Sequence, residues 1–342
     1  MVRYRALEHA KGNVGLVERQ LARIDRNGRL LGAVAPIANW ASSRDNRICR
    51  TMVEKVAGIH RDAAVPRFES DPLSRRNTSD SPSVAPNAPA AGRKVVIYNN
   101  CFVEYNEPQI GLAARAVLAK NGIEATFVYP GCCGMPAMER GDLESVRKLA
   151  RTAAGELCAW IDKGYDIVTL IPSCSFMVKN TWPLYFPDEP DIMRLSEATF
   201  DVCEYLVAVE RTDGLAEGLA PLDGGVALHV ACHARAQNIG PKAAVMLRLI
   251  PDIDVLVMER CSGHGGTWGM MKENFETGME VGTDLITQTA ESGRRYLSSE
   301  CPLAGEQIVQ GLERFPDGSL PASRSWHPIE LLAMSYGVTP AP

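Results

Sequence analysis

Two adjacent cysteines are the residues of this sequence with the clearest chemistry. Cys132 and Cys133 lie in a turn rich in glycine and proline, Gly131-Cys132-Cys133-Gly134-Met135-Pro136. Neighbouring Cα atoms are only about 3.8 Å apart, so a disulfide between these two residues would be strained. The glycines allow the backbone to approach a bound group closely, and both sulfurs can then face it. We therefore interpret the pair as metal ligands.

An altered copy of this turn occurs later, as Cys261-Ser262-Gly263-His264-Gly265-Gly266, with Ser262 where the second cysteine would be. The interval from Cys101 to Cys132 is 31 residues, and the interval from Cys232 to Cys261 is 29. Beyond the turns, Cys174 follows Cys133 by 41 residues and Cys301 follows Cys261 by 40. Matching cysteines at matching intervals indicate an internal duplication.

Short apolar runs typical of buried strands precede these cysteines. They cover 95–98, 125–129 and 167–171 in the first half, and 226–230, 254–258 and 296–297 in the second. Helices are predicted between them, at 109–121, 142–163, 241–250 and 275–292. Each cysteine site thus follows the carboxyl end of a strand, where open parallel sheets gather their ligands. The predicted fold is α/β, with two duplicated domains of short parallel sheets flanked by helices, preceded by a helical arm.

The chain is predicted to divide into four parts. Residues 1–63 form a helical N-terminal arm, 64–93 a disordered linker, 94–222 the first repeat and 223–342 the second. Within the arm, the apolar stretch 30–40 ends at Trp40, and flanking arginines would suit anionic headgroups. The same stretch would equally suit packing on a partner or on the chain's own core, since Pro36 interrupts a long helix.

Composition and charge argue against several classes of protein. The chain has 342 residues, ten cysteines and a formal net charge of −5, which argues against a nucleic-acid partner. Its first residues lack the apolar segment of a secretory signal, so we expect a cytoplasmic location. Clustered cysteines in that reducing compartment bind metals more often than they form disulfides. No run reaches the roughly 18 apolar residues that a membrane-spanning helix needs.

Several stretches together resemble a known family, the cysteine-rich "CCG" domain. It occurs in pairs in one subunit of anaerobic glycerol-3-phosphate dehydrogenase, in the iron–sulfur subunit of glycolate oxidase, in a lactate-utilisation protein and in one subunit of heterodisulfide reductase. The likeness is greatest to the first of these. It is carried by 35–40, by the turn at Cys132, by 172–175, by 231–233, by 265–274 and by 326–332.

Four thiolates in the first repeat make a full set for one 4Fe–4S cluster, namely Cys101, Cys132, Cys133 and Cys174. The same residues would also suit zinc, or could be four small buried side chains. The second repeat supplies three thiolates, from Cys232, Cys261 and Cys301, and His264 could complete the set. His233 could also complete the set, and is otherwise a candidate for orienting the ligands.

Cys158 and Cys203 lie on predicted helices and are interpreted as core residues. Cys49 is the only cysteine before Cys101, so the ferredoxin-like cysteine runs with which family members usually begin are not found here.

The resemblance implies an iron–sulfur electron-transfer subunit without a flavin of its own. It would pass electrons from a flavoprotein dehydrogenase subunit toward quinone or another membrane electron acceptor. Such a protein would be cytoplasmic and peripheral on the inner face of the plasma membrane. The alternatives are a thiol–disulfide oxidoreductase similar to heterodisulfide reductase, and a docking scaffold without catalysis.

Overall fold

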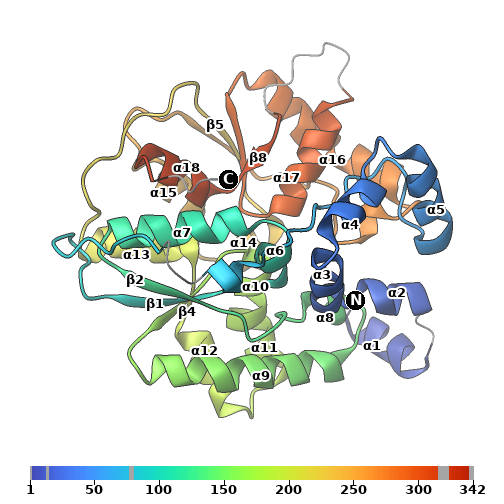
Figure 1. The fold of residues 1–342 in the computed structure, drawn as a ribbon, viewed down its shortest axis with the longest axis horizontal. Coiled ribbons are helices and arrows are strands. Elements are labelled where there is room, and N and C mark those ends of the chain that lie inside the picture. Colours follow the sequence, from blue (N-terminus) through green and yellow to red (C-terminus); the bar gives the residue numbers. More distant parts are fainter. Residues whose placement is uncertain (1, 13–14, 77–80, 315–322, 339–342) are drawn as a thin grey trace. The chain divides into compact units, whose positions relative to one another are not determined.

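The computed structural model of the protein describes residues 2–12, 15–76, 81–314 and 323–338, which form two compact units (Figure 1). The first unit combines the residues up to Val34 with Phe68–Ala216. The second combines Ala35–Arg67 with the residues from Glu217 onward. Each unit contains one β-sheet and one of the two repeats.

The sheet of the first unit has four parallel strands in the order β2-β1-β3-β4. Its central strand, β1 (Lys94–Tyr98), is buried from Val95 onward, as expected for a strand covered on both faces. Figure 1 shows helices on both sides of this sheet, with α7 and α13 on one side and α9 and α12 on the other. The remaining strands are β2 (Glu124–Val128), β3 (Asp166–Thr169) and β4 (Thr199–Asp201), and the covering helices are α7 (Pro108–Lys120), α9 (Leu143–Ile161), α12 (Pro190–Glu197) and α13 (Val202–Thr212).

Shorter helices surround the cysteines of the first unit. They are α6 (Cys101–Tyr105), α8 (Met135–Glu139), α10 (Pro172–Phe176) and α11 (Trp182–Tyr185), and a π-helical turn spans Met177–Thr181.

The sheet of the second unit repeats the same arrangement, with parallel strands in the order β6-β5-β7-β8. The predicted fold class, two duplicated α/β domains with short parallel sheets, is therefore confirmed. The strands are β5 (Val226–His229), β6 (Val255–Met258), β7 (Tyr296–Ser299) and β8 (Ser325–Trp326), and the helices are α14 (Cys232–Ala236), α15 (Lys242–Leu247), α16 (Phe275–Glu291), α17 (Pro302–Leu312) and α18 (Pro328–Ser335).

The N-terminal region is helical, as predicted, and its helices belong to both units. The first unit includes α1 (Val2–Ala10), α2 (Leu16–Leu21) and α3 (Ile24–Gly32), and the second includes α4 (Ala35–Ser42) and α5 (Arg47–Ala57). Pro36 lies at the second position of α4, where its missing N–H removes no intrahelical bond. Among the described helices, none is both long and apolar enough to cross a bilayer.

The stretch predicted as a linker has little regular structure in its described parts, 64–76 and 81–93. One 3-10 turn spans Leu73–Arg76, and residues 77–80 lie outside the described residues. Leu73 is nonetheless fully buried, and the Glu69 amide donates to the Tyr105 carbonyl oxygen at 2.8 Å. The described parts thus include residues packed on the first repeat, and the domain boundaries themselves stay a prediction.

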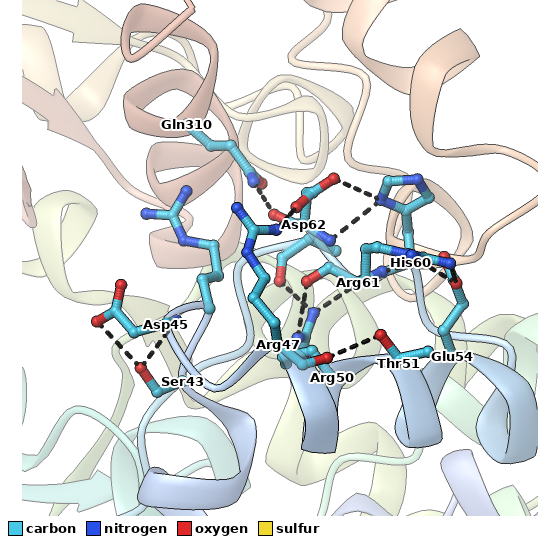
Figure 2. A network of polar contacts seen from close by, with 12 residues as sticks. Ser43, Asp45, Arg47, Arg50, Thr51, Glu54, His60, Arg61, Asp62 and Gln310 are labelled. Atoms are coloured by element: carbon cyan, nitrogen blue, oxygen red, sulfur yellow. Dashed lines mark hydrogen bonds and ion pairs between the residues drawn. The ribbon is translucent and has the colours of Figure 1, made fainter.

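A fully buried arginine holds α5 to the segment that follows it (Figure 2). The Arg50 guanidinium donates to the carbonyl oxygens of Arg61 at 2.9 Å, His60 at 2.7 Å and Ala63 at 2.7 Å. The His60 ring in turn stacks on Phe275, with centroids 4.2 Å apart and planes 12° apart. Three charge-assisted bonds to backbone make this guanidinium a cross-link that a lysine could not reproduce.

The same segment completes the core of the second unit. Ala63 is buried in the apolar cluster formed by α16, α17 and the sheet, and Ile59 packs against it. Backbone hydrogen bonds join Lys272 to Gly58 at 2.7 Å and His60 to Met270 at 2.8 Å. The second unit is therefore built from two stretches of chain far apart in sequence.

Candidate metal centre

Four thiols from three strand ends converge in the first unit. Cys101 begins α6 directly after β1, Cys132 and Cys133 lie in the turn after β2, and Cys174 lies on α10 after β3. All four are buried free thiols. The Sγ atoms of Cys101 and Cys132 are 3.6 Å apart, and Cys133 interacts with both Cys132 and Cys174. The structure thus joins the four predicted ligands of this repeat into one group.

The backbone of the turn is shaped for this convergence. Gly131 and Gly134 have φ values of 124° and 83°, a region that side chains other than glycine rarely adopt. The Gly134 amide points at Cys132 Sγ, at 3.4 Å. Trp182, which is fully buried, donates from Nε1 to the Cys133 carbonyl oxygen at 3.2 Å. These bonds fix the direction of both sulfurs.

The thiols influence one another's protonation strongly. Hydrogen bonds from Cys101 and Cys133 lower the pKa of the Cys132 thiol well below its usual range. The pKa values of Cys101 and Cys133 are raised, first by their hydrogen bonds to Cys132 and also by burial. Of these three thiols, Cys132 is therefore the favoured thiolate in the metal-free group. A bound metal centre supplies the positive charge that favours deprotonation of its cysteine ligands.

The donor set fits a thiolate-bound metal. Four buried sulfurs with no disulfide among them match the Cys₄ ligation of a 4Fe–4S cluster and of structural zinc. Two thiolates around one tetrahedral zinc, with Zn–S bonds of about 2.3 Å, would be about 3.8 Å apart. The 3.6 Å separation of Cys101 and Cys132 is close to that value.

The cysteines of the second unit occupy the same strand ends but are more accessible. Cys232 and Cys261 are exposed and Cys301 is half-buried. Partial withdrawal from water, and also the nearby Cys261, raise the pKa of Cys232, so these two thiols are neighbours. Cys301 lies at the N-cap of α17, where its amide donates to Ser299 Oγ at 3.3 Å.

His264 and His233 differ in their surroundings. The His264 ring is buried in the turn after Cys261, and its Nε2 has no hydrogen-bond partner in the described part of the chain. Burial lowers the pKa of His264 to about 4, so the imidazole is neutral and has a lone pair available for a metal. His233 is half-buried on α14, and burial lowers its pKa as well. No described contact joins His264 Nε2 to the thiols, and its role as a ligand stays a prediction.

The two sheets give a residue-by-residue equivalence between the repeats. Tyr98 pairs with Thr169, and His229 pairs with Ser299. Three residues after each partner lies the proline that begins the next helix, Pro172 in α10 and Pro302 in α17.

By this equivalence Cys301 corresponds to Ile171, and Cys174 corresponds to Ala304. Cys174 and Cys301 are therefore not counterparts, although their intervals from the turns suggest it. The cysteine of the first repeat lies three positions further along than the cysteine of the second.

Sequence reasoning missed the two residues at the ends of the central strands. Tyr98 donates to the Gly131 carbonyl oxygen at 3.0 Å, directly before Cys132. His229 contacts the Arg260 carbonyl oxygen at 3.2 Å, directly before Cys261. Burial lowers the pKa of His229 to about 4, so its ring is a neutral donor here. The signal was available, since each residue lies three positions before the first cysteine of its repeat.

The comparisons with known proteins agree with this geometry. The family described as cysteine-rich domain matches twice, over residues 95–179 and 226–308, which are the two stretches that carry the cysteines. Each of these two stretches is a cysteine-rich domain of this family. A search of solved structures gives a hypothetical protein from Helicobacter pylori, with 11% identity, a TM-score of 0.50 and coverage of 78% of this chain and 53% of that one. That likeness concerns the fold alone.

Among relatives that the chain resembles over most of its length, two are subunits of oxidoreductases. One subunit of anaerobic glycerol-3-phosphate dehydrogenase from Escherichia coli is 26% identical over 92% of this chain and 76% of the relative. One subunit of fumarate reductase (CoM/CoB) from Methanothermobacter marburgensis is 26% identical over 72% and 47%. A lactate utilization protein from Bacillus cytotoxicus is 26% identical over 56% and 85%.

Proposed function

We propose that this protein is an iron–sulfur electron-transfer subunit whose first repeat holds a 4Fe–4S cluster on Cys101, Cys132, Cys133 and Cys174. The observation that carries the proposal is the convergence of these four buried thiols at three strand ends. A cluster held there would accept and release single electrons. The chain's own residues would exclude water and set the potential through burial and hydrogen bonds.

The second repeat supports a more accessible site on Cys232, Cys261 and Cys301, with His264 as the fourth candidate ligand. Three thiolates and a neutral imidazole are a donor set known for iron and zinc. The exposure of Cys232 and Cys261 would let an electron partner or a thiol substrate approach that site. The same exposure favours the second candidate function, a thiol–disulfide oxidoreductase.

For the partners, we propose a flavoprotein dehydrogenase subunit as donor, with no flavin on this chain, and a quinone or another membrane acceptor. The similarity to one subunit of a multi-subunit dehydrogenase supports a dehydrogenase partner subunit.

An apolar face on α4 and α5 supports a peripheral place on the inner side of the plasma membrane. Ile48, Met52 and Val56 follow one another at four-residue intervals and are 77%, 62% and 74% exposed. Trp40 on α4 is also exposed, and tryptophan prefers the level of the lipid headgroups.

We expect Ile48→Glu and Met52→Glu to reduce flotation with anionic vesicles. Leu184→Glu, which changes an equally exposed apolar residue of the first unit, is the matched control.

The decisive experiment is anaerobic purification followed by iron and sulfide analysis and EPR. We expect about four irons in the first repeat, lost in Cys133→Ser and retained in Cys158→Ser, which alters a buried thiol outside the group. One zinc per chain, lost in the same variant, would favour the single-metal site that the 3.6 Å separation suits. A protein without metal would contradict the electron-transfer proposal and leave a docking scaffold.

A further inference from the structure

Helix α3 of the N-terminal region lies against the thiols of the first repeat. Ile24 packs on the buried group formed by Cys101, Tyr105 and Cys132. Four residues later, Gly28 contacts the Tyr105 ring so closely that a Cβ added there would be 2.5 Å from Tyr105 Cδ2. Residues four apart share one face of a helix, so the face through Ile24 and Gly28 is fitted to the cysteine site.

Asp25, the residue after Ile24, contacts one tyrosine on each of the two segments that carry Cys101 and Cys132. Asp25 Oδ1 accepts a hydrogen bond from the Tyr105 hydroxyl at 3.3 Å and another, shorter one from the Tyr129 hydroxyl. Tyr105 lies four residues after Cys101, and Tyr129 three residues before Cys132. The two rings meet edge to face, with centroids 5.7 Å apart. One carboxylate on α3 therefore ties together the two segments that carry these thiols.

The Asp25 charge also acts on a sulfur of the group. The pKa of Cys101 is raised chiefly by its hydrogen bond to Cys132 and by burial, and the Asp25 charge adds to the same effect. Burial, and then the nearby Cys101, raise the pKa of Tyr129. Both tyrosines keep their hydroxyl protons, and each proton points to Asp25.

We propose that Asp25 is a positioning residue of the metal centre, which holds α3 as a cover over Cys101 and Cys132 and fixes a negative charge beside the bound group. This inference rests on the proposed function. A nearby negative charge opposes the addition of an electron and therefore lowers the reduction potential of the centre.

The first test measures how well α3 shields Cys101 and Cys132 from a thiol reagent in the metal-free protein. Wild type and Asp25→Asn are treated with iodoacetamide under reducing conditions, and labelling of each cysteine peptide is followed by mass spectrometry. We expect labelling of Cys101 and Cys132 to accelerate by about ten-fold in Asp25→Asn, with Cys232 as an unchanged internal reference. Asp188→Asn, which alters an exposed carboxylate of the same unit, is the control.

Gly28→Ala tests the cover without touching the carboxylate. Its added Cβ would push α3 away from Tyr105, so the same two thiols should again be labelled faster. Gly155→Ala is the matched control, because Gly155 also lies within a helix but has no atom within 4 Å of an added Cβ.

The second test measures the reduction potential of the anaerobically loaded protein by EPR-monitored titration. We expect a more positive potential in Asp25→Asn and no shift in Asp188→Asn, an outcome that a merely structural role would not produce. Unchanged labelling of Cys101 and Cys132 in both Asp25→Asn and Gly28→Ala would overturn the cover, and an unchanged potential would overturn the electrostatic role. If wild type binds no redox-active metal, the proposed function fails, and the labelling experiment alone decides whether α3 covers the thiols.

Discussion

The two repeats share one fold and differ in what surrounds their cysteines. In the first repeat four thiols are buried and interact directly, whereas in the second Cys232 and Cys261 are exposed. The strands, their order and the positions of the first cysteines are the same in both. The fold therefore places ligands at strand ends, and the neighbouring loops and helices decide how far each site is withdrawn from water. Withdrawal suits a fixed electron carrier, and exposure suits exchange with another molecule.

The largest expected effect comes from changing the ligand sets themselves. Cys132→Ser should remove all metal from the first repeat, because it deletes the thiolate to which both neighbours bond. Cys261→Ser should leave that metal in place. Ala304→Cys restores a thiol at the position equivalent to Cys174, and should raise the iron content of the second repeat. Iron and sulfide analysis with EPR of the three variants checks this, and loss of the first repeat's metal in Cys261→Ser would contradict the independence of the sites.

The next largest expected effect is on the free energy of unfolding. It depends on how tightly the backbone packs around the glycine of each cysteine turn. A Cβ on Gly263 would lie 1.8 Å from the Gly278 carbonyl oxygen, and Gly263 has a φ of 77°. We expect Gly263→Ala to lower the free energy of unfolding by about 4 kcal/mol, from strain and overpacking together.

The first repeat should tolerate the corresponding change better. A Cβ on Gly134 would meet nothing closer than 3.5 Å, so Gly134→Ala should cost about 1–2 kcal/mol from backbone strain alone. Gly293→Ala, with a positive φ and open space around it, is the control. Denaturant unfolding measures all three, and similar losses for Gly263 and Gly134 would show that the two turns are held alike.

Acid should destabilise the second repeat through His229. The first repeat has Tyr98 at the equivalent position and should not lose stability there. The pKa of His229 is lowered to about 4, and that of an unfolded histidine is about 6.5. Between these values the unfolded state binds more protons, so the stability present above about pH 6.5 falls as the pH falls toward 4, by about 3 kcal/mol. His229→Tyr installs the residue found at the equivalent position of the first repeat and should remove this part of the loss. Unfolding at several pH values checks it, and an unchanged acid loss would exclude His229 as its source.

The smallest expected effect tests the same position in the first repeat. Tyr98→Phe deletes the hydrogen bond to the Gly131 carbonyl oxygen and should lower the free energy of unfolding by about 1 kcal/mol. Because Tyr98 is buried and its pKa is raised, this loss should be equal at neutral and mildly acidic pH. A loss that varied with pH in that range would contradict the expected contrast between Tyr98 and the acid-sensitive His229.

The repeated fold could be predicted from the sequence because, of the eight strands in the described residues, six are apolar runs followed by cysteines. β4 and β8 were missed, since strands of three and two residues contain too few positions for a recognisable pattern. The four thiols of the first repeat were named, but not the residues that surround them. Asp25 and Tyr129 are brought together across 104 residues by tertiary packing, which leaves no local signal. The equivalence of Cys301 with Ile171 needed the strand register, because interval counting hides a shift of three residues.

The way in which residues 35–67 complete the second unit has a consequence for the order of folding during synthesis. Residues 35–67 leave the ribosome early, yet the core they complete includes α16 and α17, which are made near the end of translation. Until then, Ala63 and the apolar side of this segment have no native partner. The first unit can acquire its sheet while the chain is still growing, but the second must wait for the last repeat. A nascent chain of this protein is therefore expected to need protection by chaperones at its beginning, and a shortened gene that starts after residue 67 would encode a second unit without part of its own interior.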